Sequence, residues 1–327
     1  MKITLSAGLV ANLISFCSIV TLGAGDEFPL KKLMPLTYVV DYEPFWSPDG
    51  HQIVLISNRH GGMKVHTMDA NSEDHGSNMR QLTTGEAEDD SPVWSPDGRR
   101  IAFVSVRGGV PQIFVMNADG TNPLQLTSGA SQNIHPAWSP DSSRILFNTT
   151  HFVGTGPVTD SSPAADKRVI GDATDEGMDL ATMRADGTDL QRLTNRSGHR
   201  DASYTYAWFS PDGKSIVHRR LHGEVSQIFV MNADGSDDHN VSGASTLDGW
   251  PAWSSDGKRI VFARRVQDAF QIFVMNRDGS EVRQLTDALG GAKDGGFTNP
   301  RWSPDGTKIL CSRRLNGITL VVFKAPS

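Results

Sequence analysis

The stretch that decides the fold runs from Gln112 to Phe147 and reads QIFVMNADGTNPLQLTSGASQNIHPAWSPDSSRILF. Apolar and polar residues alternate in four short segments of it, at 112–116, 123–127, 136–139 and 144–147. Such alternation, rich in Ile, Val, Phe and Trp, indicates β-strands, and the Asp119-Gly120 pair between two of them indicates a hairpin turn. The stretch therefore predicts a four-stranded antiparallel sheet.

Copies of this stretch recur along the chain and can be followed by the serine of a Trp-Ser-Pro-Asp-Gly signature. The six serines are Ser47, Ser95, Ser139, Ser210, Ser254 and Ser303. By subtraction they are 48, 44, 71, 44 and 49 residues apart, so five units have similar size and one carries an insertion. Four-stranded repeats of roughly 40–50 residues are typical of β-propellers. We expect an all-β chain that forms a six-bladed β-propeller.

The ends of the repeats indicate how the ring closes. A Leu-Thr pair, or Val241-Ser242 as a weakened copy, ends the outermost strand of five units, and the sixth copy lies at Leu36-Thr37, ahead of the first signature. The chain ends on a third strand at 318–324. We therefore expect residues 36–40 to pair beside 318–324 and complete the last blade, which removes an open sheet edge.

Composition and the N-terminal segment limit the classes of function. Residues 1–25 hold Lys2, an apolar run and a Gly-Ala-Gly exit, which is the pattern of a secretory signal peptide. We expect 26–35 to be a lead-in and 36–327 to be the propeller, in a periplasmic or secreted protein that does not span the membrane after cleavage. Removing one Lys changes the formal net charge from −6 to −7, so we expect no binding to nucleic acid.

One long insertion interrupts the third repeat. Residues 148–177 contain Gly, Pro, Ser, Thr and Asp with little periodicity. A loop of this length inside a compact repeat is usually functional or disordered. We interpret it as a contact segment or a lid.

The SPDG, IFVMNADG and QLT motifs resemble the Pro-Asp variant of the WD-type repeat that builds TolB-like six-bladed propellers. The resemblance covers roughly residues 36–327. It implies a propeller that works in the bacterial cell envelope by binding a protein or peptide. In that family an N-terminal α/β domain precedes the propeller, and about ten residues stand in its place here. Similar repeats occur in oligogalacturonate lyase, a metal-dependent enzyme, which implies a carbohydrate-active enzyme as the alternative.

The loops that lead into the innermost strands and those that join the second and third strands gather on one face of a propeller, where function is normally found. Aligned on these loops, Asp41, Asp89 and Asp248 share one position, with Glu43 and Asp90 beside them. Carboxylates arranged in this way predict a site for a hard cation such as calcium or manganese, or for a basic peptide. The alternative is a solvated acidic rim without a cofactor.

Basic and aromatic residues form the other candidates on this face. Arg220, Arg264 and Arg313 share one position in consecutive blades and suit an acidic ligand, unless they pair with the acidic loops. Trp250, with Glu43 and Asn299 near it in the alignment, is expected to contact a sugar or a peptide. The candidates for proton abstraction from a uronate, with an acidic oligosaccharide as substrate, are His135, His151, His199, His222 and Tyr206.

Overall fold

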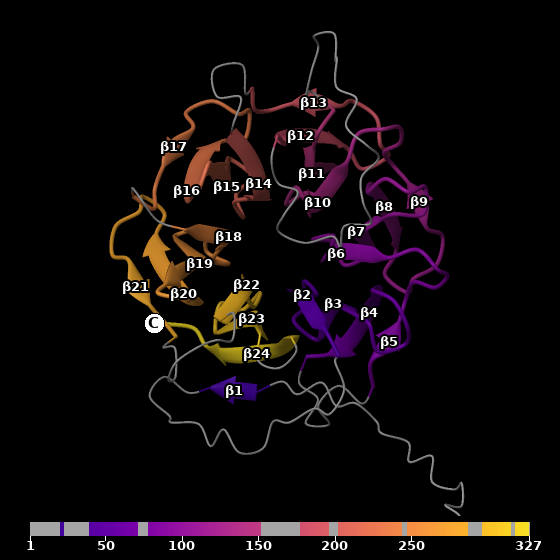
Figure 1. Ribbon diagram of the computed structural model, residues 1–327, viewed down its shortest axis with the longest axis horizontal. Coiled ribbons are helices and arrows are strands. Elements are labelled where there is room, and N and C mark those ends of the chain that lie inside the picture. Colours follow the sequence, from indigo (N-terminus) through magenta and orange to yellow (C-terminus); the bar gives the residue numbers. More distant parts are fainter. Residues whose placement is uncertain are drawn as a thin grey trace, which may run out of the picture.

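The computed structural model describes residues 20–22, 39–70, 78–151, 177–195, 202–243, 247–286, 296–314 and 318–326. In this part of the chain the regular structure is all β. Its strands form four four-stranded sheets and one eight-stranded sheet, and the eight-stranded sheet consists of two successive strand sets that are joined by a single parallel pair, Phe270 with Gly296. We number the resulting six strand sets as blades one to six. Figure 1, which looks down the shortest axis of the molecule, shows the blades around a common centre.

Within each blade the strands run from the centre to the rim in chain order. The innermost strands are β2 (Asp41–Trp46), β6 (Asp89–Trp94), β10 (Asn133–Trp138), β14 (Ala202–Phe209), β18 (Asp248–Trp253) and β22 (Gly296–Trp302). The second strands are β3 (Gln52–Ser57), β7 (Arg100–Ser105), β11 (Arg144–Thr149), β15 (Ser215–His222), β19 (Arg259–Val266) and β23 (Lys308–Arg314). Each innermost strand contacts that of the next blade, and β22 contacts β2, so the described inner strands form a closed ring.

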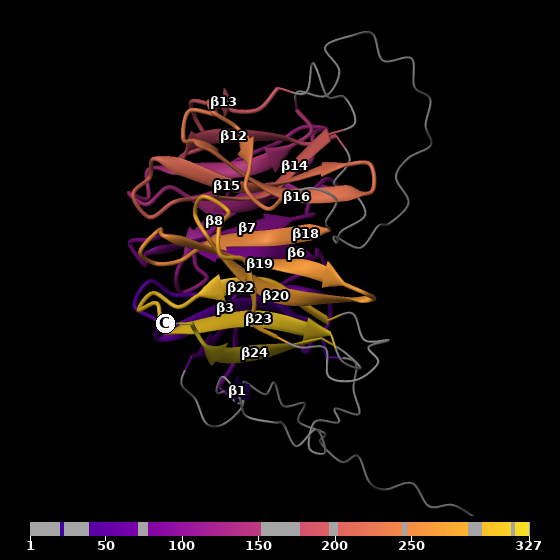
Figure 2. The ribbon, with the colours of Figure 1, turned by 90° about the vertical axis from the view of Figure 1, so that its left-hand side faces the viewer.

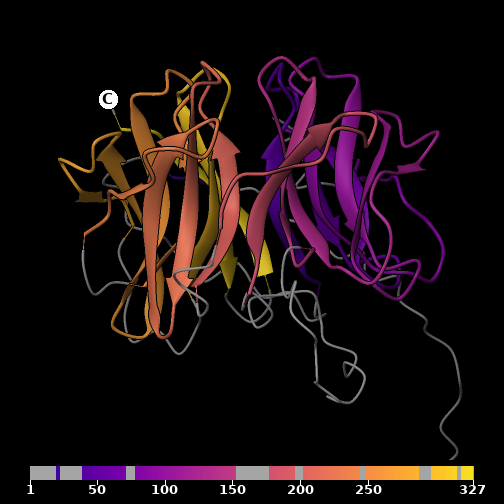
Figure 3. The ribbon, with the colours of Figure 1, turned by 90° about the horizontal axis from the view of Figure 1, so that it is seen from above.

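The outer half of each blade is formed by the third and fourth strands. The third strands are β4 (Lys64–Asp69), β8 (Gln112–Asn117), β12 (Asp179–Arg184), β16 (Val225–Asn232), β20 (Ala269–Asn276) and β24 (Ile318–Lys324). The fourth strands of blades one to five are β5 (Arg80–Gln81), β9 (Leu124–Gln125), β13 (Gln191–Arg192), β17 (His239–Asn240) and β21 (Arg283–Gln284). Strands this short leave little unpaired edge at the rim. Figures 2 and 3 show the sheets standing side by side around the axis.

The strand beside β24 differs in part from our expectation. An N-terminal strand does lie there, but it is β1 (Val20–Leu22), inside the segment that we interpreted as a signal peptide, and it pairs in parallel. Residues 36–38 lie outside the described part. Val40 instead prolongs β2: its N–H donates to Asn58 Oδ1 (2.9 Å) and its carbonyl accepts from the Asn58 N–H (3.3 Å). The predicted position of Val40 beside β24 was therefore wrong.

The Ser-Pro-Asp-Gly turns hold the first two strands of each blade together. In blade one the Ser47 hydroxyl donates to Asp49 Oδ1 (2.5 Å), and the same oxygen accepts from the His51 N–H (3.0 Å). Hydrogen bonds from Ser47 and His51 lower the pKa of the exposed Asp49. The same pair of contacts recurs at Asp97, Asp141, Asp212, Asp256 and Asp305. Because each turn is satisfied locally, every copy of the signature specifies its own hairpin.

In blades two to five, the turn between the third and fourth strands touches the blade before it. The Asp119-Gly120 turn of blade two lies against the outer edge of blade one, where a side chain added at Gly120 would meet the Leu82 carbonyl at 3.0 Å. Gly187 has the same relationship to Leu126. A positive φ at both glycines also favours a residue without Cβ. Consecutive blades are thus in contact at the rim as well as at the centre.

The hydrophobic core lies between neighbouring blades. Trp94 of blade two, for example, packs with Val54 and Ile56 of blade one and with Ile101 of its own blade. The signature tryptophans are between 5% and 8% exposed. Their position in the core between blades is as the repeat predicts. No helix in the described ranges is long and apolar enough to span a bilayer.

Candidate functional site

Six residues at one repeated position of the innermost strands have a left-handed backbone, and none is glycine. We call them the axial ring: Glu43, Ser91, His135, Tyr206, Trp250 and Asn299, with φ of 50°, 49°, 50°, 51°, 50° and 53°. In each blade the strand register breaks at this position. Five of the six precede a proline, which has no N–H to give to the ladder. The sequence thus produces a bulge in every innermost strand.

This backbone is energetically unfavourable for side-chain-bearing residues. A left-handed non-glycine residue costs about 1–3 kcal/mol and persists only where the surroundings enforce it. In the axial ring the cost recurs six times around one axis. Backbone strain of this kind clusters at functional sites, and here each blade contributes a different side chain to one place.

Two residues further along the same strands, an aromatic and cationic cluster lies beside the axial ring. We call it the axial plug: Phe45, Trp208 and Arg301, from blades one, four and six. The Phe45 and Trp208 rings stack with centroids 5.2 Å apart. The Arg301 guanidinium lies 4.2 Å from the Trp208 ring centroid. Burial lowers the pKa of Arg301 to about 10, and the charge of Glu43 opposes that shift.

Glu43 and Asp90 form a pair of carboxyl groups from blades one and two. Asp90 is 2% exposed, and its Oδ1 accepts the Ser91 N–H (2.8 Å). Burial, followed by the neighbouring Glu43 carboxylate, raises the pKa of Asp90 well above its ordinary value. Burial also raises the pKa of Glu43, against the effect of its hydrogen bonds and of Arg301. Burial and Asp90 raise the pKa of Tyr42 as well. Two such groups side by side cannot both ionise readily.

The opposite part of the ring is aromatic. The His135 ring centroid lies 4.1 Å from that of Tyr206, which lies 5.7 Å from that of Trp250. The Arg219 guanidinium is 5.8 Å and 5.9 Å from the Tyr206 and Trp250 centroids. Burial lowers the pKa of His135 to about 3, so its imidazole is neutral at physiological pH. Trp250 also packs edge-on against Phe270.

Several buried polar atoms of these groups have no hydrogen-bond partner among the described residues. They are Glu43 Oε2, Ser91 Oγ, His135 Nδ1, Trp208 Nε1 and Arg301 Nε. Ser91 lies beside Glu43, but its hydroxyl makes no hydrogen bond of normal geometry. Buried polar groups are usually satisfied by protein, water or ligand. Water or a polar ligand at the axis would satisfy these five atoms.

The structure brings together only some of the predicted catalytic residues. His135 and Tyr206 contact each other, whereas His151 and His222 are exposed, and His199 lies outside the described ranges. The predicted long loop at 148–177 also lies mostly outside them; of its first residues, Asn148 and Thr149 belong to β11. Of the predicted ligand-binding residues, Glu43, Trp250 and Asn299 lie in the axial ring.

The three aspartates predicted to bind a metal each face an arginine of their own blade. Arg59 Nη2 donates to both oxygens of Asp41 at 3.1 and 3.0 Å. Arg264 holds Asp248 in the same bidentate way, and Arg107 lies 3.9 Å from Asp89. Within the described ranges, no group of three His, Cys, Asp or Glu side chains is placed to hold a metal ion. Arginines in this position also neutralise the predicted acidic rim.

The three arginines predicted to bind an acidic ligand differ because their cross-strand neighbours differ. Arg264 stands opposite Asp248 and binds its carboxylate. Arg220 stands opposite Tyr204 and lies 5.4 Å from its ring centroid. Arg313 stands opposite Phe297 and lies 5.2 Å from that centroid. Each is engaged within its own blade, so they do not form one cationic surface.

Sequence reasoning gave too little weight to Ser91, Arg219 and Arg301. The sequence does contain a signal for Arg301. In blades one to six, the residue that follows the proline, or its equivalent, is Phe45, Val93, Ala137, Trp208, Ala252 and Arg301. One charged residue in an otherwise apolar set marks a special position. For Ser91 no comparable signal exists, because serine is common in loops.

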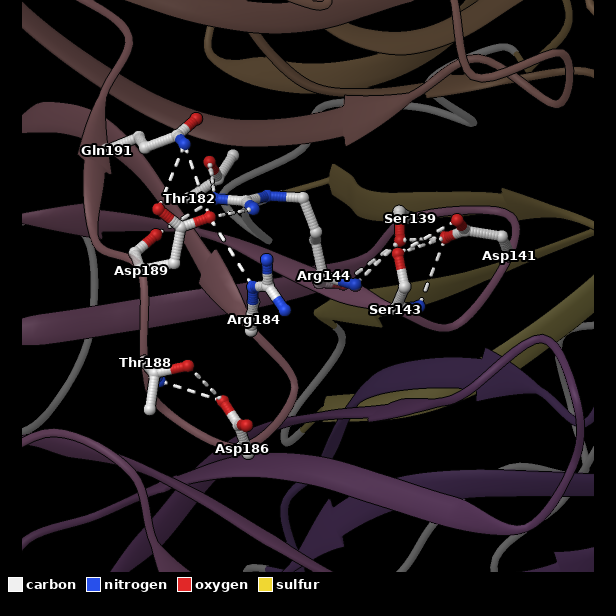
Figure 4. Close-up of polar contacts among 10 residues, drawn as sticks. All are labelled: Ser139, Asp141, Ser143, Arg144, Thr182, Arg184, Asp186, Thr188, Asp189 and Gln191. Carbon is white, nitrogen blue, oxygen red and sulfur yellow. Dashed lines mark hydrogen bonds and ion pairs between the residues drawn. The ribbon is translucent and has the colours of Figure 1, made fainter.

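A second candidate lies on the opposite face, between blades three and four. It is a cleft of about 610 Å³ lined by residues that include Ser139, Arg144, Gln191 and Phe209. Figure 4 shows that Arg144 turns toward its own outer strand, donating to Asp189 Oδ2 (2.7 Å) and to Thr182 Oγ1 (3.0 Å). Asp141 accepts from Ser139 and Ser143. Since these polar groups already bind one another, the cleft is a weaker candidate than the axial ring.

Comparisons with known proteins agree with this architecture. The profile of the family described as TolB beta propeller domain matches residues 32–154 and 150–324. A structure of putative TolB from Agrobacterium tumefaciens is 24% identical, with a TM-score of 0.63, over 89% of this chain and 92% of that one. TolB from Acinetobacter baumannii is 18% identical, with a TM-score of 0.58, over 88% and 67%. An oligogalacturonate lyase in complex with manganese is 13% identical, with a TM-score of 0.57, over 88% and 91%. A search of curated proteins gave no match.

Proposed function

Because the chain belongs to the TolB β-propeller family, we propose that it is an exported binding module that holds a protein or peptide partner at the axial ring. Export follows from the signal-peptide pattern of residues 1–25. The observation that carries the proposal is the axial ring itself, with six strained residues and unsatisfied buried atoms. A ring to which each blade contributes one side chain suits the end of a peptide or one side chain of a partner, while the surrounding loops contact the rest.

Binding is better supported than catalysis. Elimination from a uronate needs a base whose pKa lies near the working pH. His135, with a pKa of about 3, is a poor base, and His151 and His222 are exposed. We therefore expect no increase in ultraviolet absorbance from unsaturated products when the protein is incubated with oligogalacturonate.

The test is selection of peptides from a random display library on the immobilised protein, followed by affinity measurement for the peptides obtained. We expect Trp250→Ala to weaken binding about tenfold or more, as is common for a buried aromatic anchor. Ser91→Ala, which removes a single oxygen, serves as a second variant in case Trp250→Ala folds poorly. Leu190→Ala, an exposed residue beside β13, is the matched control. Equal affinities in all variants would show that peptides bind elsewhere.

A further inference from the structure

Building on the proposed function, we propose that the group bound at the axial ring is a primary ammonium ion, which takes the place of a proton shared by Glu43 and Asp90. Such a group is carried by a lysine side chain or by the free amino terminus of a peptide. The chemistry is the same for both, and the experiment below separates them.

The first argument is the number and location of free acceptors. Glu43 Oε2, Ser91 Oγ and His135 Nδ1 are buried and make no hydrogen bond of normal geometry among the described residues, with Ser91 beside Glu43 and His135 beside Asn148. They come from the same ring position of blades one, two and three, whose innermost strands contact one another in that order. A neutral imidazole protonated at Nε2 presents Nδ1 as an acceptor. A primary ammonium has three N–H donors and no acceptor, so it matches the three atoms one to one.

The second argument is charge. With one shared proton, the two carboxyl groups carry one negative charge, which Arg301 nearby balances. An unpaired cation in place of that proton lets both carboxylates ionise, and the total charge is unchanged. An anionic ligand would instead add a negative charge to a pair that already resists ionisation. The raised pKa values of Glu43 and Asp90 are consistent with such a proton.

The binding step conserves charge and atoms. The free ammonium enters, three N–H···acceptor hydrogen bonds form, and the proton shared by the two carboxyl groups passes to the solvent. No covalent bond changes. One proton is therefore released for each ligand bound at neutral pH. Other titratable and charged groups surround the pair. Tyr42 and Glu88 lie on the side of blades one and two, and Arg301 lies on blade six. His135 and Arg219 lie beyond Ser91.

The same geometry predicts which cations are rejected. A trimethylated lysine has the charge but no N–H donor, so it cannot satisfy the three acceptors. A guanidinium has five donors in a plane, which do not fit acceptors spread over three blades. Selectivity for a primary amine over both is thus part of the proposal.

The test is calorimetric titration of the full-length protein with three small probes. These are Nα-acetyl-lysine amide, alaninamide with a free amino terminus, and Nα-acetyl-norleucine amide, which lacks the charge. Concentrations reach about 20 mM, because small fragments bind weakly. We expect one or both amines to bind and norleucine not to bind. Titrations in two buffers of different ionisation enthalpy should show release of about one proton. Nα-acetyl-trimethyllysine amide should not bind.

Variants locate the site. Glu43→Gln and Ser91→Ala should each weaken amine binding about tenfold or more, as expected for loss of a charge-assisted hydrogen bond. Asp90→Asn should weaken it as well, because the pair then loses the negative charge that offsets the ammonium. Glu281→Gln removes an exposed carboxylate of the same charge just before β21, on blade five, and should leave the affinity within about twofold. Absence of amine binding to the wild-type protein, binding of norleucine as strong as that of lysine, or no proton release would overturn the proposal.

The outcome separates this inference from the proposed function. Peptides from the display library that bind equally well after acetylation of all their amines would support peptide binding and refute the ammonium. Amine binding without any peptide binder would support the ammonium and refute the broader proposal.

Discussion

Phe45 of blade one and Trp208 of blade four stack with ring centroids 5.2 Å apart and an angle of 17° between the ring planes. The two blades stand on opposite sides of a ring of six, so this contact crosses the axis. Arg301 from blade six covers the Trp208 ring. Three blades that are distant in sequence are thereby joined at the centre, next to the axial ring.

Trp208→Ala should therefore lower the stability of the whole ring. The substitution removes the stacking with Phe45 and leaves the Arg301 guanidinium with only the more distant Phe45 ring, whose centroid lies 5.8 Å away, at a cost of about 3 kcal/mol. Urea unfolding followed by circular dichroism measures the change in the free energy of unfolding. Val282→Ala, at a 43% exposed position, should change it by less than about 0.5 kcal/mol. A Trp208→Ala protein as stable as wild type would contradict a role for the axial plug.

Arg264→Met should be far more costly than Arg265→Met. Arg264 holds the fully buried carboxylate of Asp248 with bonds of 2.7 and 2.9 Å. Removing it leaves a buried charge without its main partner, which costs about 3–5 kcal/mol. Arg265, at the next position, is 47% exposed and lies 4.0 Å from the exposed Asp268. Its loss should cost less than about 1 kcal/mol. Thermal unfolding of both variants at low and high salt measures the difference.

His66→Phe should reduce acid sensitivity. His66 is fully buried, and burial lowers its pKa from 6.5 to about 4. The unfolded chain therefore takes up a proton at higher pH than the folded chain. The stability that neutral His66 contributes is complete above pH 6.5 and is lost as the pH falls toward 4. At about 1.36 kcal/mol per pH unit, this loss is roughly 3 kcal/mol.

Phenylalanine already occupies the equivalent position in other blades, at Phe114, Phe229 and Phe273, so the variant should fold normally. Urea midpoints measured between pH 7.5 and 4 for both proteins check this prediction. Parallel loss of stability in the two would show that other groups cause the acid sensitivity.

Ser91→Gly and Ser91→Ala should separate strain from recognition. Both remove the hydroxyl, so both should weaken ligand binding to the same extent. Glycine adopts the φ of 49° without a Cβ clash, whereas alanine keeps the strain. The glycine variant should therefore be more stable than the alanine variant by about 1 kcal/mol. Chemical denaturation of the pair measures this, and an alanine variant of equal or higher stability would argue against strain at the ring.

The N-terminal segment gives a further prediction. Val20–Leu22 pairs with β24 but also lies within the predicted signal peptide. We expect the protein produced in a bacterium with its own leader to reach the periplasm and to have a mass that begins near Asp26. The processed chain should keep the circular dichroism spectrum of the propeller, since β1 contributes only three residues. A mass that includes residues 1–25 would rule out cleavage.

The fold was more accessible to sequence reasoning than the site. The Ser-Pro-Asp-Gly turns are satisfied by contacts within five residues, so their spacing predicts the number and order of the sheets. The left-handed ring has no such signal. Glycine and asparagine are the residues that normally indicate a positive φ, whereas five of these six positions hold Glu, Ser, His, Tyr and Trp. The environment of Asp90 also depends on Glu43, a residue from another blade.

The contact between Gly120 and the Leu82 carbonyl has a consequence for how such chains can grow. A duplicated repeat inserted into the ring must fit two neighbours at their outer margins, besides supplying its own sheet. Copies that lost this glycine would be held apart from the preceding unit. Related proteins that gain or lose repeats should therefore keep a small residue at the position of Gly120, even where the rest of the repeat changes in sequence.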